Sequence, residues 1–115
     1  MKKIDWMYHR KGCNTCQKAQ EFLARAKIVP AETADAKKST RSKADALKLA
    51  LNATKIIATK GRKVITVDVA KEKPGADFVA SLIVGPSGNL RAPAAWIGST
   101  LLVGFNEEMY KSALA

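Results

Sequence analysis

Apolar and polar positions in the first third of the chain form a short apolar run and then a longer amphipathic segment. Residues 4–8 are apolar or aromatic except for one aspartate, and the polar stretch 9–12 follows, which is the pattern of a buried strand that ends at a turn. Beyond this turn, four apolar residues have the i, i+3, i+4, i+7 spacing of one helical face: Ala19, Phe22, Leu23 and Ala26. We predict that Asn14 or Thr15 caps this helix and that a second strand covers 30–34.

The middle of the chain changes from helical spacing to alternation. Apolar residues recur on one helical face over 42–58, and Ser42 followed by Asp45 resembles a capping box. A glycine then interrupts the pattern, and successive residues of 64–69 alternate between two faces, as in a strand. After a Pro-Gly turn, residues 76–83 fit a short helix. We therefore predict a helix over 42–58, a strand and a second helix.

Turn signals divide the last third of the chain. Residues 85–89 form the clearest turn cluster, and the apolar runs 94–97 and 100–103 are separated by the two-residue hairpin signal Gly98-Ser99. Asn106 is a helix cap, and two glutamates follow it in the first turn, where the helix dipole favours acidic groups. The chain thus alternates strands and helices, which predicts an α/β protein.

The length of the chain fits one domain. It has 115 residues, of which 47% are hydrophobic, enough apolar material for a single core. No run approaches the ~18 apolar residues that a membrane helix needs, and no long apolar segment follows the first residues. We therefore expect a single domain over 1–115, located in the cytoplasm, with no membrane partner.

Basic residues outnumber acidic ones two to one, which gives a net charge of +10. Many of them lie between residues 37 and 73: Lys37, Lys38, Arg41, Lys43, Lys48, Lys55, Lys60, Arg62, Lys63, Lys71 and Lys73. Such a face attracts oxyanions, anionic peptides or nucleic acid, although lysines also serve as a solvated helix surface. Trp6 and Trp96 fall on predicted strands, where core packing is expected rather than base stacking, and we expect an acidic protein partner for the basic face in preference to a nucleic acid.

The two cysteines of the chain are placed where a thiol becomes reactive. Cys13 lies at the junction between the first strand and the first helix, where the helix dipole and free backbone N–H groups stabilise a thiolate. Arg10 and Lys11 precede it and add positive charge. Cys16 follows one helical turn later, so the two sulfurs can close a disulfide. We predict that Cys13 is the nucleophile and Cys16 the resolving thiol.

Two other interpretations of the cysteine pair compete with redox chemistry. A structural zinc site needs about four ligands, and His9 is the only histidine beside the pair, so we predict no metal site. Two buried cysteines that only fill the core are the second alternative. A reducing compartment and the position between a strand and an amphipathic helix favour the redox interpretation.

Three segments together resemble a known family. They are Cys13-Asn-Thr-Cys16-Gln-Lys-Ala with Phe22-Leu23 behind it, Asn89-Leu-Arg-Ala-Pro93, and Leu102-Val-Gly-Phe-Asn-Glu-Glu108. In this order and spacing they are similar to the thioredoxin-fold arsenate reductases of the glutaredoxin-dependent class and to the related Spx-type regulators. The resemblance implies a thioredoxin-like α/β fold, with a mixed four-stranded sheet flanked by helices and a helical insertion after the second strand, at about 40–84.

The resemblance also implies roles for single residues. Cys13 carries the nucleophilic role, and a basic pocket holds the substrate anion, for which Arg10, Lys11 and Arg91 are our candidates. Pro93 occupies the position of the family's cis-proline, which lies against the active thiol. In the reductases an arginine usually stands directly before this proline, whereas here Ala92 separates Arg91 from it.

The predicted function is thiol–disulfide oxidoreduction of the arsenate reductase-like or glutaredoxin-like kind. The substrate is expected to be a small thiol or an oxyanion, with no bound cofactor, and with glutathione, thioredoxin or glutaredoxin as electron donor and redox protein partner. The alternative is a redox-sensing Spx-like regulator, in which a Cys13–Cys16 disulfide controls the binding of a protein partner. A third hypothesis is a structural thioredoxin-fold domain whose thiols are unreactive.

Overall fold

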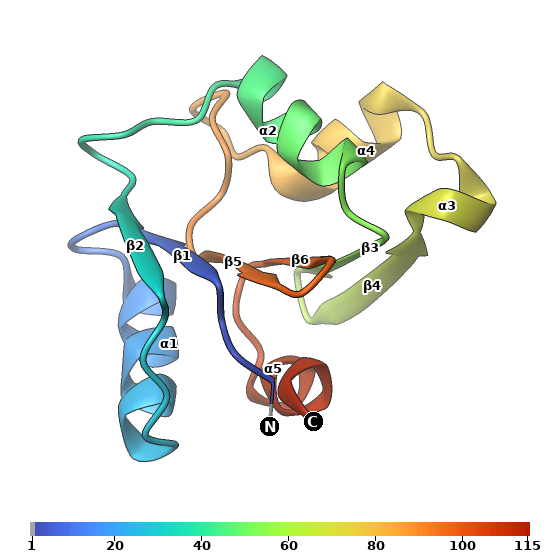
Figure 1. The fold of residues 1–115 in the computed structure, drawn as a ribbon. Coiled ribbons are helices and arrows are strands. Elements are labelled where there is room, and N and C mark those ends of the chain that lie inside the picture. Colours follow the sequence, from blue (N-terminus) through green and yellow to red (C-terminus); the bar gives the residue numbers. More distant parts are fainter. Residues whose placement is uncertain (1) are drawn as a thin grey trace.

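A six-stranded mixed sheet forms the centre of the computed structural model, which describes residues 2–115 (Figure 1). Residue 1 of the predicted domain lies outside the described residues. The elements are β1 (Trp6–His9), α1 (Asn14–Arg25), β2 (Glu32–Asp35), α2 (Lys43–Leu51), β3 (Lys55–Lys60), β4 (Lys63–Asp68), α3 (Val69–Glu72), α4 (Ala76–Ile83), β5 (Ala94–Ile97), β6 (Thr100–Val103) and α5 (Glu107–Leu114). The strand order is β2-β1-β5-β6-β3-β4. The pairs β1–β2 and β3–β6 are parallel, and the other neighbours are antiparallel.

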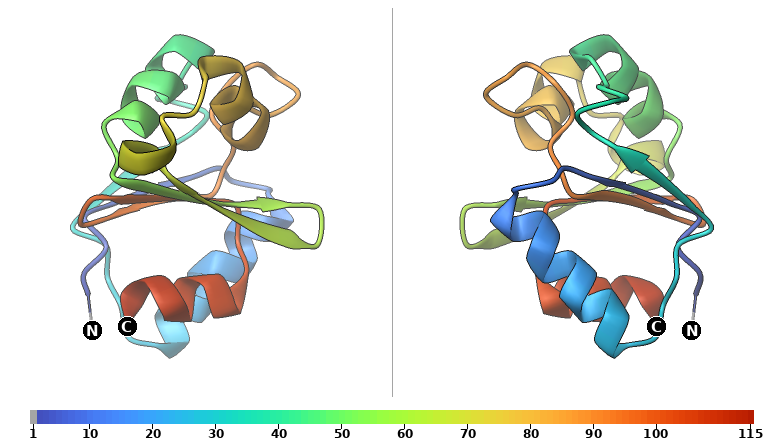
Figure 2. Two further views of the ribbon diagram at one scale, coloured as in Figure 1. Left: turned by 90° about the vertical axis from the view of Figure 1, so that its right-hand side faces the viewer. Right: turned by 90° about the vertical axis from the view of Figure 1, so that its left-hand side faces the viewer.

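Helices cover both faces of the sheet. Figure 2 shows α1 and α5 on one face and α2, α3 and α4 on the other. Because side chains alternate along a strand, each central strand contributes to two cores. Met7 and Leu102 lie in the core beneath α1 and α5, whereas their neighbours Tyr8 and Leu101 lie in the core beneath α2 and α4.

Elements with local sequence signals are confirmed. The hairpin of β5 and β6 has the predicted bounds, as does α4 over 76–83. Ser42 caps α2, because its Oγ accepts the backbone N–H of Asp45 at 3.3 Å, and Asn106 caps α5 in the same way through Met109 at 3.0 Å. The second strand forms two residues later than predicted, at Glu32–Asp35.

The prediction of one helix over 42–58 is wrong in its second half. The helix ends at Leu51, and Lys55–Lys60 form β3, which lies between β4 and β6. Ile56 and Ala58, two positions apart, are fully buried on one face of this strand. Tertiary pairing thus overrides the helical spacing, as is common for short apolar segments. The sheet consequently has six strands rather than four, and the segment expected to be a helical insertion also contains the β3–β4 hairpin.

No helix within residues 2–115 is both long enough and apolar enough to cross a membrane.

Candidate active site

Cys13 lies at the start of α1, after the turn that follows β1. Its backbone is extended, and its Sγ accepts the backbone N–H of Cys16 at 3.4 Å, so Cys13 itself caps the helix. The prediction that Asn14 or Thr15 caps α1 is therefore wrong. The sulfur takes the place of the usual oxygen acceptor, and a thiolate in this position also lies at the positive end of the helix dipole.

The surroundings of Cys13 favour its thiolate. Burial raises the pKa of Cys13, but hydrogen bonds from the Cys16 thiol and from the backbone N–H groups of Cys16 and Thr15 lower it. The charge of Arg10 lowers it further. The lowering effects prevail, so the pKa of Cys13 lies below its ordinary value of 9.0. A larger fraction of Cys13 is therefore thiolate near neutral pH than for an ordinary cysteine.

Cys16 has the opposite character. Its side chain is 1% exposed, and its Sγ accepts the backbone N–H of Arg10 at 3.4 Å. Burial raises the pKa of Cys16 to about 12, and the hydrogen bond to Cys13 and the negative charge of Cys13 act in the same direction. The backbone N–H of Arg10 opposes this shift without cancelling it. Of the two thiols, Cys13 ionises first and Cys16 keeps its proton.

The chain segment before β5 forms the wall opposite Cys13. The Ala92–Pro93 peptide bond is cis, and Pro93 is buried. The carbonyl oxygen of Ala92 lies 4.0 Å from the Cys13 Sγ. The backbone N–H of Gly104 donates to the Pro93 carbonyl at 2.8 Å, which ties this segment to the end of β6. Residues far apart in sequence thus meet at the thiol.

Cys13 opens into a cavity of about 330 Å³ with a basic lining. Arg10, Lys37 and Arg91 contribute to this lining, together with Tyr8 and Asn89. Lys37 was not among the predicted site residues. It belongs to the basic cluster of the sequence, but no local signal separates it from the other lysines. Lys11 and His9 do not line this cavity; they line a second hollow of about 420 Å³, which also includes Arg10 and both cysteines.

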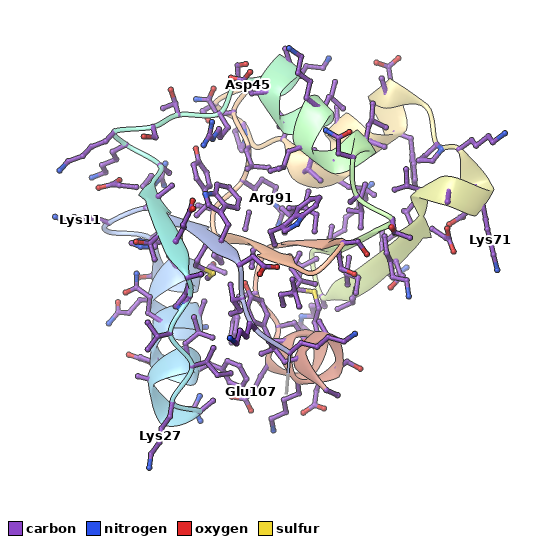
Figure 3. All side chains as sticks on the ribbon, viewed as in Figure 1. Lys11, Lys27, Asp45, Lys71, Arg91 and Glu107 are labelled. Carbon is purple, nitrogen blue, oxygen red and sulfur yellow. The ribbon has the colours of Figure 1, made fainter. Side chains whose placement is uncertain are left out.

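The guanidinium of Arg91 is held within the protein. One nitrogen donates to the carbonyl oxygens of Thr59 at 2.7 Å and Leu82 at 2.8 Å, and the other donates to the Thr59 Oγ1 at 3.0 Å. Figure 3 shows Arg91 between the sheet and the helices above it, whereas Lys11 extends outward from the edge of the molecule. Arg91 lines the cavity, but its charged group binds β3 and α4, and its predicted role toward a substrate anion stays a prediction.

Within residues 2–115, no three or more histidine, cysteine, aspartate or glutamate side chains gather in a way that could hold a metal ion. The two thiols and the positive groups near them are the chemical groups that the structure brings together here.

A strand, a Cys-x-x-Cys helix start and an opposing cis-proline, built on a mixed sheet with helices on both faces, define a thioredoxin-like protein with a thiol site. The model of the ArsC family matches residues 8–113, so the chain belongs to the ArsC family. At the level of that family, it is an arsenate reductase-like thiol oxidoreductase.

A solved structure supports the fold. The protein YffB is 24% identical to this chain, and the alignment covers 96% of this chain and 98% of YffB with a TM-score of 0.55. A search of curated proteins found no match.

Proposed function

We propose that this protein is a thiol–disulfide oxidoreductase in which Cys13 is the nucleophile and Cys16 the resolving thiol. The observation that carries the proposal is that the pKa values of two thiols one helical turn apart are shifted in opposite directions. The pKa of Cys13 is lowered by hydrogen bonds and by Arg10, which together outweigh burial, whereas burial raises that of Cys16 to about 12. Cys13 can therefore attack as a thiolate, while Cys16 stays protonated until the adduct has formed.

In the first step, the Cys13 thiolate attacks one sulfur of a substrate disulfide. A bond forms between the Cys13 Sγ and that sulfur, the substrate S–S bond breaks, and the other substrate sulfur leaves as a thiolate. The half-exposed position of Cys13 and the cavity beside it give the substrate access. Arg10 and Lys37 supply positive charge for an anionic thiol or oxyanion near the reacting sulfur.

In the second step, Cys16 resolves the adduct. Once Cys13 is bonded to the substrate, it no longer carries the charge that raises the pKa of Cys16, while the Arg10 backbone N–H still favours the Cys16 thiolate. Cys16 then loses its proton to solvent and attacks the Cys13 Sγ, so the second substrate thiolate leaves and a Cys13–Cys16 disulfide remains. The substrate gains two electrons. A thiol donor such as glutathione, thioredoxin or glutaredoxin returns the pair to the reduced state.

The reaction with 5,5′-dithiobis(2-nitrobenzoate) tests these roles. The reduced protein should release two nitrothiobenzoate anions for each chain and end as the internal disulfide. The Cys16→Ser variant should release one and keep the other as a mixed disulfide that mass spectrometry detects on Cys13. Cys13→Ser serves as the matched control and should react slowly, because Cys16 is buried and its pKa is high. Equal adduct formation in the two variants would exclude the assigned roles.

A further inference from the structure

A second cavity, larger than the one at Cys13, lies between the sheet and α2. Its volume is about 500 Å³. Its lining includes two indole rings and four charged side chains, from Trp6, Trp96, Glu32, Arg41, Asp45 and Lys48. The sequence contains no other tryptophan. The predicted core role of the tryptophans is therefore only part of their role: both pack against the core beneath α2 and α4, yet both stay partly exposed.

The sheet fixes the floor of this cavity, which we call the tryptophan cavity. Trp6 on β1 lies directly opposite Trp96 on β5, and Glu32 on β2 lies opposite Trp6 on its other side. The guanidinium carbon of Arg41 lies 5.8 Å from the centre of the Trp6 ring. The Tyr8 ring stacks on the Trp6 ring with centres 5.4 Å apart and planes 23° apart. Trp6 is thus held in place by contacts with Arg41 and Tyr8, before any ligand arrives.

Helix α2 forms the upper wall. It buries Ala46 and Ala50 in the core, so the adjacent face with Asp45 and Lys48 is free to line the cavity. Figure 3 shows Asp45 at the start of this helix. Among residues 2–115, none of the four charged side chains of the cavity forms an ion pair with another residue. An apolar floor with unpaired charges of both signs complements an apolar group flanked by charges, which is the chemistry of a polypeptide segment.

The tryptophan cavity adjoins the cavity at Cys13. Tyr8, whose ring stacks on Trp6, lines the Cys13 cavity, and its hydroxyl accepts the backbone N–H of Arg41 at 3.1 Å. Thr40 lines the Cys13 cavity, and the next residue, Arg41, lines the tryptophan cavity. Trp6 and Tyr8 are two positions apart on one strand face, or roughly 7 Å. At about 3.3 Å per residue, two or three residues of an extended peptide cover the distance between Tyr8 in the Cys13 cavity and Trp6 in the tryptophan cavity.

We propose that the tryptophan cavity binds a polypeptide substrate whose cysteine reacts at Cys13. An apolar or aromatic side chain, a few residues from that cysteine, inserts over Trp6 and Trp96, and Arg41 and Lys48 bind acidic groups beside it. The inference rests on the proposed function and narrows it, because it assigns disulfides of peptides or proteins as the preferred substrates. A small disulfide reaches Cys13 without filling this site.

Two peptides test the proposal. Each has one cysteine capped as a mixed disulfide with nitrothiobenzoate, and they differ only in a residue three positions away, Phe in one and Ser in the other, followed by Glu. The wild-type protein should react with the Phe peptide at least about tenfold faster, because burying an aromatic side chain contributes that much or more. Trp96→Ala should bring the ratio of the two rates close to one. Phe78→Ala, an exposed aromatic outside both cavities, is the control and should keep the ratio.

Intrinsic fluorescence gives a readout without chemistry. Because both tryptophans line the cavity, a Phe peptide whose cysteine is replaced by serine should change the emission saturably, and the Ser peptide should not. Lys48→Glu, an exposed substitution that leaves the core intact, should weaken this binding through repulsion of the Glu in the peptide. If the peptides react equally and neither alters the emission, the inference is wrong. If Cys13 reacts with no disulfide while the Phe peptide still alters the emission, the proposed function fails and the cavity remains a peptide site.

Discussion

Two polar centres, the Cys13 thiol and the Arg91 guanidinium, lie next to the cis-proline, and they differ in the hydrogen bonds that each makes. Cys13 is partly exposed, and its Sγ lies 4.0 Å from the Ala92 carbonyl oxygen. The Arg91 guanidinium makes three hydrogen bonds of 2.7 to 3.0 Å to Thr59 and Leu82. Gly104 packs against this second centre so closely that a Cβ there would collide with the Thr59 hydroxyl.

The difference shows what each charge does in the fold. Burying a guanidinium without hydrogen-bond acceptors costs folding free energy. The three hydrogen bonds of Arg91 avoid this cost, and they join the segment before β5 to β3 and α4. The Cys13 thiolate is stabilised by the start of α1 and by the charge of Arg10, and its sulfur lies in the lining of the cavity. The Arg91 guanidinium, which stabilises the fold, is hydrogen-bonded within the protein, whereas the Cys13 thiol, which is proposed to react, stays accessible from the cavity. We call the first the closed centre and the second the open centre.

The largest expected loss of stability comes from adding a methyl group next to the Arg91 guanidinium. Gly104→Ala should lower the free energy of unfolding by about 3–5 kcal/mol, because the backbone has φ +85° and the new methyl displaces Thr59 and Arg91. Gly98→Ala is the matched control: φ is +61°, but no atom lies within 4 Å of the added Cβ, so the cost should be about 1 kcal/mol. Urea denaturation of both variants measures the difference. Equal losses of unfolding free energy in the two variants would show that the close packing of Gly104 against Thr59 does not contribute to stability.

A smaller loss should follow from removal of the cation itself. Arg91→Met should cost about 2–4 kcal/mol in urea denaturation, because the carbonyls of Thr59 and Leu82 lose a charged donor. Arg10→Met, which removes an exposed arginine near Cys13, should change stability by no more than about 0.5 kcal/mol. The comparison breaks down if Arg91→Met keeps full stability but slows alkylation of Cys13, since Arg91 would then serve the thiolate.

The smallest effect concerns the open centre. The Arg10 charge lowers the pKa of Cys13, so Arg10→Gln should raise it and shift the alkylation profile to higher pH. Because only the thiolate reacts, the rate at neutral pH should fall by about two- to fivefold, as expected for an exposed charge pair. Lys18→Gln, an exposed charge change on α1, should leave the profile in place. Stopped-flow alkylation across a pH series separates the two.

The parts of the fold that the sequence predicts are those with local signals. The Gly98-Ser99 turn marks the β5–β6 hairpin, and Ser42 and Asn106 mark the starts of their helices. The strand followed by an amphipathic helix places Cys13 and Cys16 at their junction. Each of these signals depends on residues within a few positions of one another, so no knowledge of the tertiary structure is required.

The remaining features depend on partners far along the chain. The segment that forms β3 continues the helical spacing of α2, with Ala58 seven residues after Leu51, and its pairing with β4 and with β6, more than 40 residues later, makes it a strand. Arg91 meets Thr59 across 32 positions, and Lys37 reaches the cavity of Cys13 without a motif. Even the cap at Cys13 was missed, because sulfur is a less common cap acceptor than the oxygens of nearby Asn14 and Thr15.

The most direct test of the central claim is the pH dependence of alkylation of the two thiols in the unmodified reduced protein, resolved by fragment ions in mass spectrometry. We predict that Cys13 is modified first, with an inflection below 9.0, and that Cys16 is modified only at higher pH, because burial raises its pKa even after Cys13 has lost its charge. The same inflection for both cysteines at or above 9, or modification of Cys16 before Cys13, would contradict the assignment of nucleophile and resolving thiol.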